Sequence, residues 1–149
     1  MSRRLKQGIL VFVVIFAAAQ FVRPERANPV TDASHAIQAS AETPGEFVAV
    51  LDRSCGDCHS NRTVWPWYTR VAPVSWLMAA GVKKGREVVN FSEWADYDAA
   101  TRQALLVKSC EAVSNGAMPG GAWTTLHPEA RLSKHDIAII CAAAHQEVP

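Results

Sequence analysis

The sequence predicts an all-α domain of four helices joined by long loops, preceded by an apolar N-terminal helix and a flexible tether. Several stretches carry apolar residues at i, i+3, i+4 and i+7, which is the spacing of one helix face. Residues that favour helix N-caps precede those stretches, and no stretch alternates apolar and polar residues as a half-buried strand does. A chain of 149 residues is long enough for one such domain and a leader.

The composition is that of an ordinary globular protein, with 49% hydrophobic residues, 19% charged residues and a net charge of +1. Basic residues are neither abundant nor gathered in one block, so we expect no nucleic-acid partner. From Ala27 onward the chain holds 10 lysines and arginines against 13 aspartates and glutamates. The total therefore combines a basic leader with a mildly acidic domain, a composition that is compatible with a soluble redox protein. Its expected partner is a redox protein in the membrane or periplasm.

Residues 1–22 have the features of an export segment. Basic residues lie within the first six positions, an apolar run covers residues 8–19, and Ala17-Ala18-Ala19 is similar to a small-residue cleavage site. Apolar character continues to Val22, about 15 residues from Gly8, which is long for the apolar h-region of a signal peptide but short of the ~20 residues that span a bilayer. A cleaved signal peptide and a membrane anchor over residues 8–22 both stay open. We expect a periplasmic protein, tethered to the inner membrane in the second case.

Residues 23–43 contain two prolines, small and polar residues and no sustained periodicity, which predicts a flexible linker. The domain itself is expected over residues 44–149. The Thr43-Pro44-Gly45-Glu46 run has the features of a helix start, with threonine as N-cap, proline at the first helical position and glutamate closing a capping box. This first helix is expected to extend to Ser54 and to lead directly into a cysteine motif.

Three further helices are expected along the chain. One covers residues 73–88 and starts at a proline, and the next covers residues 99–114 behind an Asp98 N-cap. The last begins at Ser133, where a capping box is expected. Residues 117–132, between the last two helices, are expected to form an irregular loop.

The first helix leads into Cys55-Gly56-Asp57-Cys58-His59, the C-x-x-C-H attachment signature of a c-type haem. The two thiols are spaced to reach the two vinyl groups of the porphyrin, and the histidine follows as the proximal ligand of the iron. The sequence therefore predicts one covalent haem c, held by Cys55, Cys58 and His59 in a small cytochrome c-like domain.

A C-x-x-C pair also occurs in zinc sites and in redox dithiols. A zinc site of the usual kind takes a second closely spaced ligand pair, whereas Cys110 and Cys141 lie far apart in the sequence. A thioredoxin-like dithiol lies in strand–helix alternation, which this sequence lacks. For Cys110 and Cys141 two alternatives stay open: a disulfide between two helices in an oxidising compartment, and two buried free thiols.

A haem iron with one imidazole ligand has a second axial position, and Met118 is the first candidate for it. Met118 begins the non-helical Met118-Pro119-Gly120-Gly121 run, from which its thioether can face His59 across the haem. The alternative for Met118 is a packing role in the core. His127 is the second candidate for this position and Met78 is the third.

Several sequence motifs follow one another in the chain: Cys55-x-x-Cys-His-Ser-Asn-x-Thr-x-Trp-Pro-Trp-Tyr68, Ala72–Trp76, Asn90–Trp94, Met118-Pro119 and Leu126–Ser133. They resemble the bacterial haem-binding domain family of small exported c-type haem proteins, and Arg23-Pro24 with Asn28-Pro29 in the leader is also similar. The resemblance implies a haem c on Cys55, Cys58 and His59, with Met118 as the matching residue on the other side.

These features predict single-electron transfer between membrane or periplasmic redox partners. No general acid–base pair or nucleophile stands out, so we do not expect a stand-alone enzyme. The alternative from another class is a haem-based small-ligand sensor or a peroxidase-like enzyme, in which the sixth iron position is open or displaceable.

Overall fold

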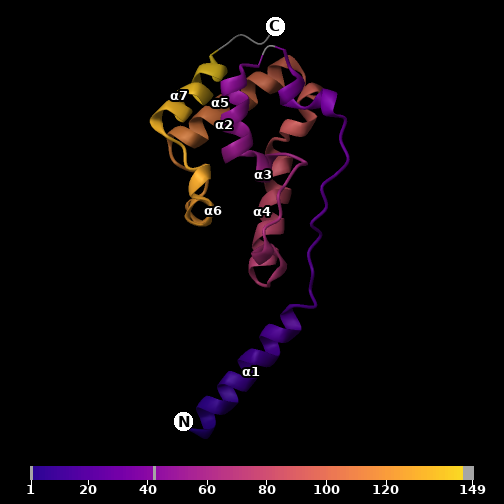
Figure 1. Ribbon diagram of the computed structural model, residues 1–149, viewed down its shortest axis with the longest axis vertical. Helices are drawn as coiled ribbons and strands as arrows, with labels where there is room; N and C mark the ends of the chain where they lie inside the picture. Colours follow the sequence, from indigo (N-terminus) through magenta and orange to yellow (C-terminus); the bar gives the residue numbers. More distant parts are fainter. Residues whose placement is uncertain (1, 42, 146–149) are drawn as a thin grey trace.

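The computed structural model describes residues 2–41 and 43–145, and within these ranges the chain is all-helical with no strand. Figure 1 shows a group of packed helices from which a single helix, α1, extends away. The α-helices are α1 (Arg3–Ala19), α2 (Gly45–Ser54), α3 (Gly56–His59), α4 (Val74–Val88), α5 (Ala99–Ser114), α6 (Gly121–Leu126) and α7 (Lys134–Ala144). The 3-10 helices are η1 (Ala33–His35), η2 (Ile37–Ala39), η3 (Trp67–Arg70), η4 (Phe91–Asp96) and η5 (Pro128–Ala130).

The helices α2, α4, α5 and α7 correspond to the four expected in the domain, with bounds close to the expected ones. The short helices α3 and α6 are additional to those four. The start of α2 differs from the expected one. Pro44 occupies the N-cap position and no side chain caps the helix, so the capping box expected from Thr43 and Glu46 is wrong. The irregular loop expected over residues 117–132 is also wrong, because α6 and η5 lie within this stretch.

Side-chain caps fix where α5 and α7 begin. The Thr101 N–H donates to Asp98 Oδ1 at 2.7 Å. Ser133 and Asp136 form the reciprocal capping box that the sequence predicts. The Ser133 N–H donates to Asp136 Oδ2 at 2.7 Å, and the Asp136 N–H donates to Ser133 Oγ at 3.1 Å. Each cap satisfies backbone donors that a helix start leaves without intrahelical partners.

The core lies where α2, α5 and α7 meet. Leu51 from α2, Leu106 from α5 and Ile140 from α7 are buried in one apolar cluster. A disulfide joins Cys110 of α5 to Cys141 of α7, with their Cα atoms 4.7 Å apart. The disulfide is therefore the correct one of the two alternatives that the sequence leaves open for these cysteines.

Part of the stretch expected as a flexible linker, residues 23–43, packs on the domain. η1 and η2 pack against η4, and the side chain of Ile37 is 1% exposed in the main core cluster. His35 Nδ1 lies 2.7 Å from Asp96 Oδ1. Val30 and Ile37 are the two large apolar residues of this stretch, and two such residues give no periodic signal, so the sequence pattern does not reveal this packing.

α1 carries the apolar run of residues 8–19 and has no buried residue. Its leucine, isoleucine, valine and phenylalanine side chains are all exposed. Among the residues that the structure describes, no helix combines the length and the apolar character needed to cross a membrane.

Candidate functional site

The cysteine motif folds into one helical turn, α3, directly after α2. Cys55 O accepts hydrogen bonds from the Cys58 N–H at 3.1 Å and from the His59 N–H at 2.9 Å. Residues three and four positions apart share a helix face, so the turn directs both thiols and the imidazole to one side. The Cys55 N–H also donates to Leu51 O at 2.8 Å, so the packed helix α2 fixes the position of the motif.

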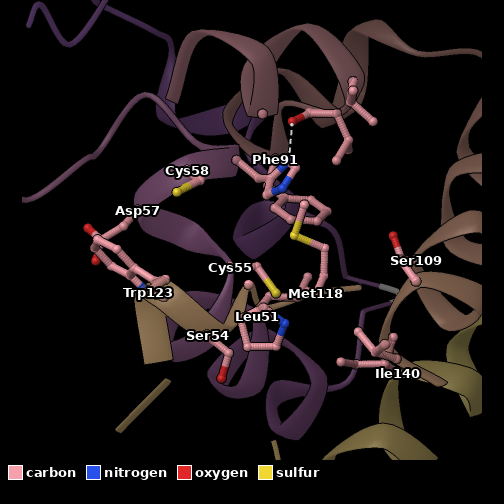
Figure 2. Close-up of a pocket in the computed structure, with 18 of the residues that line it drawn as sticks. Leu51, Ser54, Cys55, Asp57, Cys58, Phe91, Ser109, Met118, Trp123 and Ile140 are labelled. Atoms are coloured by element: carbon pink, nitrogen blue, oxygen red, sulfur yellow. Dashed lines mark hydrogen bonds between the residues drawn. The ribbon is translucent and has the colours of Figure 1, made fainter. Parts of the chain in front are cut away.

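Both cysteines and the histidine line a pocket of about 440 Å³ with mainly apolar walls. Figure 2 shows Cys55, Cys58, Met118 and Trp123 around this pocket. Its volume lies in the range of ~300–1,000 Å³ that is common for cofactor and small-molecule sites. The other lining residues include Leu51, Gly81, Gly85, Val88, Val89, Phe91, Leu105, Ala112, Val113, Pro119, Gly120 and Ile140.

The chain that follows α4 orients His59. His59 Nδ1 lies 3.3 Å from Val89 O. Because a carbonyl oxygen can only accept a hydrogen bond, His59 Nδ1 carries the hydrogen. Nε2 therefore holds the lone pair, which is the form of imidazole that binds a metal ion. Burial lowers the pKa of His59, which favours this neutral ring near pH 7.

Gly85 lets α4 pass directly over the motif. A Cβ at this position would lie 2.5 Å from Cys58 O and 3.1 Å from Cys58 C, which are backbone atoms. Gly81, one turn earlier on α4, lines the pocket, and a Cβ there would meet no atom within 4 Å. The two glycines thus have different roles. Gly85 permits the contact between α4 and the motif, and Gly81 leaves space open at the pocket wall.

Met118 reaches the same pocket from the end of α5. Gly116 follows that helix with a φ of 75°, a left-handed conformation that glycine adopts without strain. The chain then turns back, and the Met118 N–H donates to Ala112 O at 3.1 Å. The Met118 side chain is 47% exposed. The structure thus brings all four predicted site residues, from two distant parts of the sequence, to one pocket.

The family model for haem-binding domains matches residues 14–146, which include the motif, the pocket and Met118. The chain belongs to the haem-binding domain family. No curated protein and no solved structure matches it. Two thiols and a neutral imidazole on one wall of an apolar pocket, with a thioether on another wall, fit the haem that this family binds.

Burial raises the pKa of the Cys55 thiol to about 12 in this haem-binding domain, and burial also raises the pKa of Cys58. Redox dithiols and zinc sites both need an accessible thiolate, which such an environment disfavours. In the described part of the chain, no cluster of three or more His, Cys, Asp or Glu side chains could hold a metal ion. The site is therefore better suited to neutral sulfur than to thiolate chemistry.

His127, the second candidate for an iron ligand, is not among the described residues that line the pocket. Its Nδ1 lies 2.9 Å from Glu129 Oε1, and its Nε2 contacts the Tyr68 hydroxyl. Its ring stacks on Trp123 with centroids 3.7 Å apart, and Trp123 lines the pocket. His127 thus supports a pocket wall. The sequence pattern does not single out Trp123, and the one signal for it is an aromatic residue soon after Met118.

A polar network holds the loop after the motif against the end of α4. Arg86 donates from Nε to Ser60 O and from Nη2 to Thr63 Oγ1, both at 2.8 Å. Asn90 Nδ2 donates to Asn61 Oδ1 at 3.0 Å, and both asparagines are buried. The sequence did not predict these roles, and the run of polar residues directly after the motif was the only signal for them.

Proposed function

We propose that the chain binds one haem c, bonded through Cys55 and Cys58, and transfers single electrons in the bacterial cell envelope. His59 and Met118 would be the two axial ligands. The observation that carries this proposal is that these four side chains line one apolar pocket. When bound, haem supplies an iron that changes between the ferrous and ferric states.

Each side chain has a separate task in this proposal. His59 would hold the iron through Nε2, while Val89 O accepts from Nδ1, which fixes the ring and raises its basicity as a ligand. The Met118 thioether favours a higher reduction potential than a second histidine would. Thioether bonds at Cys55 and Cys58 leave no sulfur to ionise, which suits a site where burial disfavours thiolates.

Two features support a site of action outside the cytoplasm. The disulfide between Cys110 and Cys141 is of a kind that persists in oxidising compartments. Residues 1–22 have the basic start and apolar run of an export segment. We therefore propose a periplasmic haem protein whose redox partners are proteins of the periplasm or the membrane.

Acid–acetone extraction and absorption spectra of the purified protein test the attachment. We expect c-type haem bands that stay with the polypeptide, because thioether bonds survive the extraction. In Cys55→Ser/Cys58→Ser the haem should become extractable. Complete extraction of haem from the unmutated protein would contradict covalent attachment.

Met118→Ala tests the axial ligand, and Met78→Ala is the matched control because Met78 is a partly buried methionine of α4 outside the described pocket lining. The methionine–iron charge-transfer band of the oxidised protein should vanish in the first variant and remain in the second. The reduced unmutated protein should bind carbon monoxide poorly. Ready binding of carbon monoxide would contradict the electron carrier and favour a haem-based sensor or a peroxidase-like enzyme.

A further inference from the structure

A second pocket lies between the C-terminal end of α1 and the start of α4, and it is built largely from polar atoms. Its volume is about 330 Å³. Three arginines line it: Arg23, Arg26 and Arg70. None of the described residues that line this arginine pocket is acidic.

The arginine pocket exists because residues 20–28, which we call the strap, are hydrogen-bonded to the domain. The Ala72 N–H donates to the Gln20 side-chain oxygen at 3.0 Å, and Gln20 Nε2 lies 3.4 Å from Ala72 O. Trp76 Nε1 donates to Val22 O at 2.7 Å. These hydrogen bonds join the end of α1 to the domain. In Figure 1 the upper end of α1 lies below the lower end of α4.

The second half of the strap is held in the same way. Arg26 Nη1 donates to Thr69 O at 3.2 Å. Asn28 Nδ2 donates to Thr63 O at 2.9 Å, and Arg86 Nη2 donates to Asn28 Oδ1 at 2.9 Å. Both sides of the arginine pocket are therefore fixed by side-chain contacts with the backbone or with another side chain.

The guanidinium groups of the pocket have no acidic partner within the described residues, since no ion pair there involves Arg23, Arg26 or Arg70. Three like charges around one small pocket repel one another, and an anion between them replaces that repulsion by attraction. Arginine recognises phosphate through paired N–H···O hydrogen bonds, so three arginines match a phosphate group in charge and in donors.

The neighbourhood of the arginine pocket is apolar and exposed. The side chains of Phe21, Trp67 and Leu77, close in sequence to the residues that build the pocket, are 86%, 77% and 71% exposed. The exposed apolar helix α1 leads directly into the strap. Exposed aromatic and aliphatic side chains beside arginines are typical of protein surfaces at a membrane–water interface.

We propose that the arginine pocket binds the phosphate-bearing headgroup of an anionic phospholipid. The exposed apolar residues then face the acyl boundary, and the strap holds the haem-binding domain in one orientation to the bilayer. Free phosphate would accept hydrogen bonds from the same arginines, but its binding would not explain the exposed apolar surface around the pocket. The proposal does not depend on what the haem does.

Vesicle binding of the full-length protein tests the proposal, with phosphatidylcholine vesicles that contain or lack phosphatidylglycerol. Arg23→Gln/Arg70→Gln is compared with Arg131→Gln/Lys134→Gln, which removes two cations at and before the start of α7. Each basic residue at an anionic surface contributes roughly fivefold to affinity, so the pocket variant should bind phosphatidylglycerol vesicles about 30-fold more weakly. The control variant should stay within about threefold of the unmutated protein.

Three outcomes would overturn the proposal. The first is equal binding of the unmutated protein to both vesicle types, and the second is an equal loss in both double variants. The third concerns free phosphate: inorganic phosphate raises the Tm of the unmutated protein but not of Arg23→Gln/Arg70→Gln, while vesicle binding shows no preference for the anionic lipid. Far-UV circular dichroism and haem absorbance should match between the two variants, which confirms that both are folded.

Discussion

Gly85 illustrates how a single residue controls the haem site, because its missing side chain sets the distance between α4 and the motif. In Gly85→Ala, the new Cβ would lie 2.5 Å from Cys58 O, so α4 must shift away from the turn that carries Cys55, Cys58 and His59. We expect the free energy of unfolding to fall by about 1–3 kcal/mol, the cost of forcing an extra carbon into a packed contact. Urea denaturation followed by haem absorbance measures it.

Gly81→Ala is the matched control for Gly85→Ala, since it makes the same change one turn earlier on α4. A Cβ at Gly81 meets no atom within 4 Å. Alanine favours helix over glycine by up to about 1 kcal/mol, so we expect the free energy of unfolding to stay the same or to rise slightly. Equal destabilisation in the two variants would mean that the contact with Cys58 is not what Gly85 provides.

At the scale of elements, the start of α7 depends on one carboxylate. The Ser133 N–H donates a hydrogen bond to the Asp136 carboxylate, and the Ser133 hydroxyl and Arg53 also contact it. These contacts hold the pKa of Asp136 below its ordinary value of 3.8. The charged carboxylate therefore stabilises the fold above that value, and the contribution is lost as the pH falls through the lowered one. We expect Asp136→Asn to cost about 1 kcal/mol at pH 7, with a smaller cost in acid.

Urea denaturation at a series of pH values measures this cost, with Glu46→Gln as the control for removing a carboxylate. Glu46 Oε1 lies 3.0 Å from His135 Nε2, but both side chains are mostly exposed. Exposed pairs contribute little, so we expect a change within about 0.5 kcal/mol for the control. If the cost of Asp136→Asn were the same at pH 7 and in strong acid, the hydrogen-bonded carboxylate would not be its source.

The sequence predicts the long helices well because their signals are local. Asp98 and Ser133 stand directly before the helices they cap, and the apolar spacing continues behind them. α6 and η5 have fewer turns and no such spacing, and the turn between them depends on contacts of His127 with Tyr68 and Trp123. Tyr68 is distant in sequence, and a single sequence does not show which distant residues meet.

At the scale of the whole molecule, some parts of the site have a local sequence signal, and others are positioned only by contacts between distant residues. The motif from Cys55 to His59 is predictable because its chemistry and its spacing lie in one turn. Met118 is predictable as a candidate, but only the fold brings it to the pocket. Arg86 and Ile37 give no local signal, since their partners lie in segments far along the chain.

The strap changes the relation between α1 and the domain. A flexible linker of some 20 residues extends up to roughly 70 Å and lets a domain search freely for partners. The strap instead joins the end of α1 to the domain through Gln20, Trp76 and Asn28. The haem-binding domain therefore has a fixed orientation to α1, and under the proposed function a redox partner held near α1 would meet the same face of the domain each time.

Asn28→Ala tests whether the strap is held as a unit, because Asn28 exchanges hydrogen bonds with Thr63 O, Trp65 Nε1 and Arg86 Nη2. Losing three partly exposed hydrogen bonds costs about 2 kcal/mol, so the protection that the strap gives the Ala72 N–H, which donates to Gln20 Oε1, should fall roughly 30-fold in hydrogen exchange. Haem absorbance should not change. Ser34→Ala removes only a local side-chain hydrogen bond in η1 and should leave the strap as protected as before. Equal protection in both variants would mean that Asn28 does not hold the strap.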